Sequence, residues 1–223
     1  MYKPTNSPNI TGRSLFTPKS LHPICGNCCA MTCTYAPFHM EAMEQKVTET
    51  VEIETPLGIL PLNIGGTIDR MDSKDDTLRI VDYKTGGTPR TPENIEQLFV
   101  PADNRPNYIF QTFLYAAIMC RKQTLKVAPS LLYIHRAASE NYSPVIEMGA
   151  PRQPKIPVSN FAFYEDEFRE RLSALLKEIY NPEETFSQTE DNGKCEYCDF
   201  KKPMTKNKGR HGLHESYTAA DAP

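Results

Sequence analysis

Apolar and polar residues alternate along the first half of the chain in the way that is typical of strands. Val51 and Ile53 alternate with acidic residues from about residue 47 onward, which predicts a first strand. Two more strands are predicted over residues 60–70 and 78–84. The polar link at residues 73–76 is short, so these two strands should form a hairpin.

A period of three to four residues replaces this alternation in two places and predicts two amphipathic helices. The first begins at Pro106 and buries a face formed by Phe110, Phe113, Leu114, Ala117 and Ile118. The second ends at Asn181-Pro182 and buries Phe168, Leu172, Leu175, Leu176 and Ile179. Further strands are predicted over residues 129–134 and 143–148. The mixture of strands and helices predicts an α/β domain.

Composition narrows the classes of protein to consider. The 223 residues are 39% hydrophobic and 24% charged, as in ordinary globular domains. The longest apolar run covers residues 113–120, whereas a helix needs roughly 20 apolar residues to cross a bilayer. No membrane association is therefore expected. The net charge of -3 excludes binding of nucleic acid by bulk positive charge alone, but it does not exclude a nuclease with an acidic metal site.

The two ends of the chain differ from its middle. Residues 1–34 carry four prolines, a cysteine cluster and no apolar periodicity, so we expect a poorly structured N-terminal segment. Residues 35–205 should form the folded domain, and residues 206–223 a basic, disordered tail. The seven cysteines are odd in number, several stand at metal-type spacing, and no export signal is visible. Reduced thiols and a cytoplasmic location are expected.

The candidate chemistry centres on Asp82-Tyr83-Lys84 in the third predicted strand. Alternation along the strand places Asp82 and Lys84 on one face. Asp69, which we expect near the end of the preceding strand, can supply a second carboxylate beside Asp82. Two carboxylates with water and phosphate oxygens form the kind of site that Mg²⁺ prefers. Asp72, by contrast, is expected only to begin the turn.

Lys84 beside such a metal ion could orient an attacking water. Gln111 and Tyr115 stand four residues apart on the first predicted helix, so they share a stripe that could border the site. The alternatives are an exposed ion pair for Asp82 and Lys84, and an ordinary boundary between core and solvent for the two helix residues.

Three sequence segments together resemble a known family. They are Gly66-Thr67-Ile68-Asp69-Arg70, then Asp82-Tyr83-Lys84-Thr85-Gly86, and then Gln111 with Tyr115. In this order they resemble the RecB-like branch of the PD-(D/E)XK nuclease superfamily. The resemblance implies a restriction-endonuclease-like core, in which a mixed central β-sheet is flanked by α-helices.

By this resemblance Asp69 and Asp82 would bind Mg²⁺ or Mn²⁺, and Lys84 would be the catalytic lysine. Gln111 and Tyr115 would form a helix motif that faces DNA. The implied function is that of a metal-dependent deoxyribonuclease in DNA repair and recombination, with a helicase subunit or domain as its partner.

The chain departs from the family pattern upstream of Asp69. Members of the family carry a histidine or glutamate on a helix there, and only His22 and His39 precede Asp69 here. Pro23 follows His22, and His39 lies too close to the first predicted strand. We therefore expect that the chain lacks the N-terminal portion of the family's domain.

Cysteines form the second departure. Cys195-x-x-Cys198 resembles the C-terminal end of AddB-type nucleases, where further cysteines complete an iron-sulfur cluster. The next expected cysteine is absent and Met204 stands nearby, so no iron-sulfur cluster is expected. Cys25-x-x-Cys28 together with Cys195 and Cys198 has the ligand count of a Cys₄ zinc site, although unbound thiols are the favoured interpretation.

Two other functions stay open on the sequence. One is a catalytically silent DNA-binding or scaffold domain of a helicase-nuclease complex, which the missing upstream histidine favours and the retained Asp69, Asp82 and Lys84 oppose. The other is a small zinc-binding interaction module, which metal analysis of the purified protein would distinguish.

Overall fold

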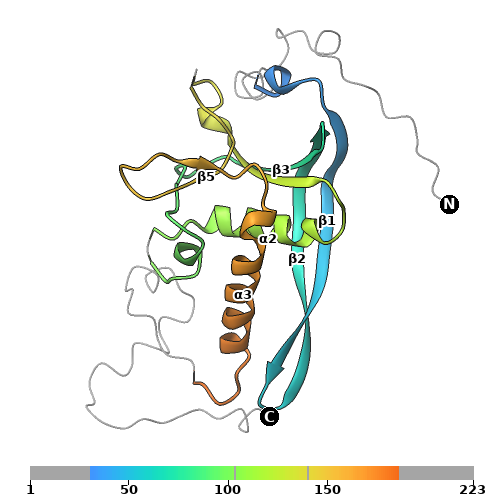
Figure 1. The fold of residues 1–223 in the computed structure, drawn as a ribbon, viewed down its shortest axis with the longest axis vertical. Coiled ribbons are helices and arrows are strands. Elements are labelled where there is room, and N and C mark those ends of the chain that lie inside the picture. Colours follow the sequence, from blue (N-terminus) through green and yellow to red (C-terminus); the bar gives the residue numbers. More distant parts are fainter. Residues whose placement is uncertain (1–30, 103, 140, 186–223) are drawn as a thin grey trace, which may run out of the picture.

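A four-stranded mixed sheet forms the centre of the protein. The computed structural model describes residues 31–102, 104–139 and 141–185. The sheet contains β1 (His39–Thr55), β2 (Gly58–Lys74), β3 (Thr77–Lys84) and β4 (Lys126–Tyr133), in that order across the sheet (Figure 1). β2 is antiparallel to both β1 and β3, and β4 runs parallel to β3. The predicted mixed sheet and the predicted hairpin are thereby confirmed.

The first two strands are longer than the alternation predicts. β1 begins at His39, which pairs with Ser73, and β2 continues to Lys74. The extra length mixes polar residues with a few apolar ones such as Ala42 and Met71 and shows no sustained alternation, so backbone pairing defines these parts of the strands. As a result Asp69 lies inside β2, and the prediction that it stands near the end of a strand is wrong.

Two helices pack beside the sheet where the sequence predicts them, although the predicted buried face of the second does not extend to Ile179, which is 46% exposed. α2 (Asn107–Cys120) starts directly after Pro106 and packs against all four strands. α3 (Ala162–Ile179) contacts α2 and β1 and runs alongside the long β1–β2 hairpin (Figure 1). Phe113, Phe161 and Phe168 are fully buried between them, with ring centroids 5.0 to 6.2 Å apart. Burial of these rings is the main contribution that fixes the helices in place.

The remaining elements are short. They are the 3-10 turns η1 (Glu96–Leu98) and η2 (Ile134–Arg136) and the two-stranded pair β5 (Glu147–Met148) and β6 (Ile156–Pro157). The strand predicted over residues 143–148 is therefore present only at its end, apart from an isolated bridge between Ser130 and Val145. None of the helices in the part of the chain that the structure describes is long and apolar enough to cross a membrane.

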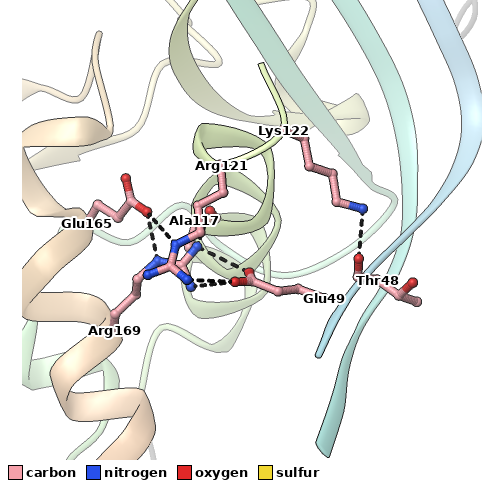
Figure 2. A network of polar contacts seen from close by, with 7 residues as sticks. All are labelled: Thr48, Glu49, Ala117, Arg121, Lys122, Glu165 and Arg169. Atoms are coloured by element: carbon pink, nitrogen blue, oxygen red, sulfur yellow. Dashed lines mark hydrogen bonds and ion pairs between the residues drawn. The ribbon is translucent and has the colours of Figure 1, made fainter. Parts of the chain in front are cut away.

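A polar network fastens α3 to the sheet (Figure 2). Arg169 of α3 donates to both carboxylate oxygens of Glu49 on β1, at 3.1 and 3.2 Å, and to Oε1 of Glu165 at 2.7 Å. It also donates to the carbonyl of Ala117 on α2. The guanidinium is largely buried, so these contacts are less screened than surface pairs. One arginine thus joins β1, α2 and α3.

The ends of the chain lie mainly outside the described residues. A short helical segment at residues 31–35 is described, and its Tyr35 ring lies 3.5 Å from the Arg79 guanidinium carbon. The predictions for residues 1–30 and 186–223 fall outside the described ranges. They include the disordered tail and the cysteines Cys25, Cys28, Cys195 and Cys198. The proposed domain boundaries stay predictions.

Candidate active site

The strand register brings the two predicted carboxylates together. Arg70 pairs with Val81 in the β2–β3 ladder, so the next residues outward, Asp69 and Asp82, stand opposite each other. Residues opposite each other on antiparallel strands share a face of the sheet. Asp82 and Lys84 share that face as well, because they are two residues apart on β3. All three side chains are therefore on the face that α2 covers.

Asp82 is the most deeply buried of these groups. Its exposed fraction is 3%, and its Oδ2 lies 2.6 Å from Nζ of Lys84. The Lys84 ammonium is therefore the ion-pair partner of this buried oxygen, and no other donor among the described residues reaches it. Burial raises the pKa of Asp82, the adjacent Lys84 ammonium lowers it, and the Asp69 carboxylate raises it further. Such an oxygen is suited to receive a cation.

Asp69 is held in place by the backbone of the neighbouring strand. The amide N–H of Tyr83 donates to its Oδ2 at 2.7 Å. The second oxygen, Oδ1, has no hydrogen-bond partner within the described part of the chain. Asp69 therefore offers a fixed carboxylate with one oxygen available beside Asp82.

A chain of hydrogen bonds positions Lys84 from α2. The Lys84 ammonium donates to Oε1 of Gln111 at 3.0 Å, and Nε2 of Gln111 donates to the hydroxyl of Tyr115 at 3.0 Å. The four-residue spacing of Gln111 and Tyr115 on one helix stripe makes this chain possible. Tyr115 is only 5% exposed, so its hydroxyl faces the sheet. The DNA-facing role of the pair stays a prediction, whereas their contact with Lys84 is a feature of the structure.

Gly66 of β2 provides the space that Tyr115 occupies. A Cβ atom at Gly66 would lie 2.5 Å from the Tyr115 hydroxyl and 3.0 Å from its nearest ring carbon. Real Cβ atoms essentially never come so close to another heavy atom, so a side chain here would displace the tyrosine. The glycine that precedes the Asp69 motif is thus connected to Lys84 through Tyr115 and Gln111.

Tyr108 is a further neighbour of the site, and none of the sequence motifs includes it. Its ring lies 4.4 Å from Nζ of Lys84, and 40% of the residue is exposed. A cation over an aromatic face is an attractive contact. The signal was available in principle, since Tyr108 stands three residues before Gln111 and therefore shares its side of the helix.

Asp72 has a different role from the one predicted. It does not begin the turn: it is fully buried within β2, on the opposite face of the sheet. Nε of Arg70 donates to Oδ2 of Asp72 at 2.8 Å, and Arg79 donates to both oxygens at 2.9 Å. Arg70 thus forms its ion pair with Asp72, two residues along the same strand. The prediction failed because Arg79, one of the two arginine partners, lies on another strand.

The donor set limits the metal ions that the site could hold. The structure describes residues 31–102, 104–139 and 141–185. Within these ranges, no group of three or more histidine, cysteine, aspartate or glutamate side chains is placed to bind a metal. Asp69 and Asp82 offer oxygen ligands only. Mg²⁺ is typically bound by one or two carboxylates and keeps several water molecules, so the two aspartates fit it, whereas zinc prefers nitrogen and sulfur.

Comparison with known proteins gives one match. The model of the PD-(D/E)XK nuclease superfamily matches residues 27–202, which include both aspartates, Lys84, Gln111 and Tyr115. Among curated proteins no significant match was found.

Proposed function

Because the chain belongs to the PD-(D/E)XK nuclease superfamily, we propose that it is a metal-dependent deoxyribonuclease domain that hydrolyses phosphodiester bonds. The observation that supports this most is the buried Oδ2 of Asp82, which no donor in the described residues other than the Lys84 ammonium reaches and which stands across from Asp69. A buried carboxylate that is compensated by one ammonium and faces a second carboxylate is costly to a protein that does not use it. Nucleases of this superfamily generally use Mg²⁺ or Mn²⁺.

In this proposal Asp69 and Asp82 hold the metal ion with one oxygen each. When bound, Mg²⁺ or Mn²⁺ would supply Lewis-acid stabilisation of the charge that develops on the phosphate. The Tyr83 amide fixes the Asp69 carboxylate, and burial between β2, β3 and α2 fixes Asp82. The chain itself thus provides two oriented oxygens before any cation arrives.

Lys84 is proposed as the group that handles the attacking water. An ammonium has three N–H donors. Gln111 accepts one of them and Asp82 lies beside a second, so the third is available to a water molecule or to a phosphate oxygen. Held in this way, Lys84 would orient the water and stabilise negative charge on the phosphate as the new bond forms. Gln111 and Tyr115 act as positioning residues for Lys84.

The biological setting is part of the proposal. The three segments around Asp69, Asp82 and Gln111 resemble the RecB-like branch, which supports DNA repair or recombination as the process and a helicase subunit or domain as the partner. The same resemblance supports DNA as the substrate, since a nuclease of this superfamily is expected to act on it.

The test is a cleavage assay on labelled single-stranded and double-stranded DNA with Mg²⁺ or Mn²⁺. The purified chain should cleave at least one of the two substrates, and Asp82→Ala should lower the rate by about 1,000-fold or more, which corresponds to roughly 4 kcal/mol of lost transition-state stabilisation. Asp166→Ala, which removes an exposed carboxylate on α3, is the matched control and should cleave as the wild type does.

Each outcome has a defined meaning. Equal cleavage by wild type and Asp82→Ala would assign the activity to a contaminant or to another site. DNA binding without any cleavage in either metal would favour the silent DNA-binding or scaffold domain. Stoichiometric zinc in the purified protein, without activity, would favour the zinc-binding module.

A further inference from the structure

A cavity of about 410 Å³ lies beside the candidate active site, and Asp69, Asp82 and Lys84 do not line it. It opens between the loop that follows β3, the first turn of α2 and the segment that follows β4. Its volume is in the range of roughly 300–1,000 Å³ that is typical of small-molecule sites. One nucleotide unit is a ligand of suitable size.

The wall of this cavity is continuous with the surroundings of Lys84. Tyr133, which lines the cavity, pairs with Lys84 in the parallel ladder of β3 and β4. Tyr108 lies over the Lys84 ammonium, and its ring centroid is 6.4 Å from that of Tyr133. A strand of DNA whose phosphate reached Lys84 could therefore place a neighbouring nucleotide in this cavity.

The chemistry of the lining suits a nucleotide. Ile109, Leu131 and Tyr133 are buried and form an apolar wall on which a base could pack. Arg90 and Arg136 lie at the exposed side of the cavity. Neither guanidinium has an ion-pair or hydrogen-bond partner among the residues that the structure describes, and one carboxylate, that of Glu147, lines the same cavity. Two arginines that are unpaired in the described part of the chain, beside an apolar wall, can bind phosphate and base together.

The cavity wall is also well fixed. β4 is the last strand of the sheet, and the hydroxyl of Tyr142 bonds to its open edge. That hydroxyl accepts from the Tyr133 amide at 2.7 Å and donates to the Leu131 carbonyl at 2.8 Å. A preformed wall lowers the entropic cost of ordering a ligand against it.

We propose that this cavity is a nucleotide subsite, which binds one unit of a single DNA strand next to the phosphate that Lys84 contacts. The inference rests on the proposed function in taking DNA as the ligand. It adds a binding role for Arg90 and Arg136 and a packing role for Ile109 and Tyr133, none of which belongs to the metal site.

The test measures binding without cleavage. A fluorescein-labelled single-stranded oligonucleotide is titrated with the full chain in EDTA, and fluorescence anisotropy gives the affinity at several salt concentrations. Replacing both Arg90 and Arg136 by alanine should weaken binding about tenfold or more and reduce the slope of log K against log salt by about 1. Arg171→Ala on α3, whose guanidinium already pairs with Glu167, is the matched control and should change neither quantity.

A second variant separates the cavity from a merely basic surface. Val145 lines the cavity and is 40% exposed, so Val145→Trp should fill the space without disturbing the fold, and Val145→Phe is a smaller filler if the tryptophan variant unfolds. Filling should weaken binding about tenfold with an unchanged salt slope, because both arginines remain. An oligonucleotide of abasic units should bind the wild type and the filled variant equally.

Unchanged affinity in the folded filler variants would overturn the proposal, even if the arginine variants bind more weakly. The assay contains no metal and no cleavage step. If the chain does not cleave DNA but the filler variants bind it more weakly, the nuclease proposal fails and the subsite stands. If the chain cleaves DNA but the filler variants bind it as the wild type does, the subsite fails and the nuclease proposal stands.

Discussion

Two buried aspartates on the same hairpin have opposite surroundings. Asp72 and Asp82 are 0% and 3% exposed and lie on opposite faces of the sheet. Asp72 receives well-oriented hydrogen bonds from two arginines, whereas Asp82 has a lysine close by and an oxygen that no other donor in the described residues reaches. Burial alone therefore does not separate a structural carboxylate from a functional one. The difference is whether side chains of the protein donate hydrogen bonds to the carboxylate oxygens.

The largest expected effect concerns Asp72, whose oxygens accept hydrogen bonds from two arginines. Asp72→Asn keeps the shape of the side chain but leaves the Arg70 and Arg79 charges buried without a counter-charge. We expect the free energy of unfolding to fall by about 3–5 kcal/mol, measured by urea denaturation. Asp75→Asn, in the adjacent turn, is the control, because Asp75 is exposed and asparagine tolerates its positive φ. A loss below about 1 kcal/mol for Asp72→Asn would break the contrast between the two aspartates.

The second prediction concerns Asp82 and the effect of a metal ion on the free energy of unfolding. Mn²⁺ at a hundred times its dissociation constant should stabilise the wild-type chain by about 2.7 kcal/mol, because only the folded state holds the two aspartates together. Asp82→Asn should show no such gain. Urea denaturation with and without MnCl₂ measures both. Equal stabilisation of the two proteins would show that the cation binds elsewhere.

The smallest effect sharpens the role of the lysine. The Lys84 ammonium lies 2.6 Å from the oxygen that the metal ion would use, so the two cations compete for it. Lys84→Met should therefore bind Mn²⁺ about tenfold more tightly, or by about 1.4 kcal/mol, while DNA cleavage is lost. Calorimetric titration gives the affinity, and Lys126→Met, at an exposed pair with Asp76, is the control. Weaker metal binding in Lys84→Met would indicate that the lysine supports the metal site.

The sequence was most informative where a local rule determines the geometry. Alternation alone placed Asp82 and Lys84 on one face, and the four-residue spacing on α2 placed Gln111 and Tyr115 together. Pro106 and the apolar period located the start of α2 to within a residue. These features depend on neighbours in the chain, so they can be deduced without knowing the fold.

The sequence was least informative where partners come from different elements. The burial of Asp72 depends on Arg79 from another strand and on Tyr35 from the segment before β1. The N-terminal half of β1, which shows no sustained alternation, becomes strand because β2 pairs with it. Likewise, Tyr108 is significant only because β3 brings Lys84 beneath its ring. No pattern along a single segment contains this information.

The close approach of Gly66 to Tyr115 has a consequence for the evolution of the domain. Gly65 and Gly66 are neighbours that exclude side chains for different reasons. At Gly65 the backbone φ is +153° and a Cβ would overlap the Val47 carbonyl oxygen. Because this oxygen belongs to the backbone, no substitution of another side chain could make room for a Cβ. At Gly66 the obstacle is the Tyr115 side chain itself. The first glycine is therefore fixed by the backbone, while the second can vary only in lineages where the aromatic residue on α2 changes with it.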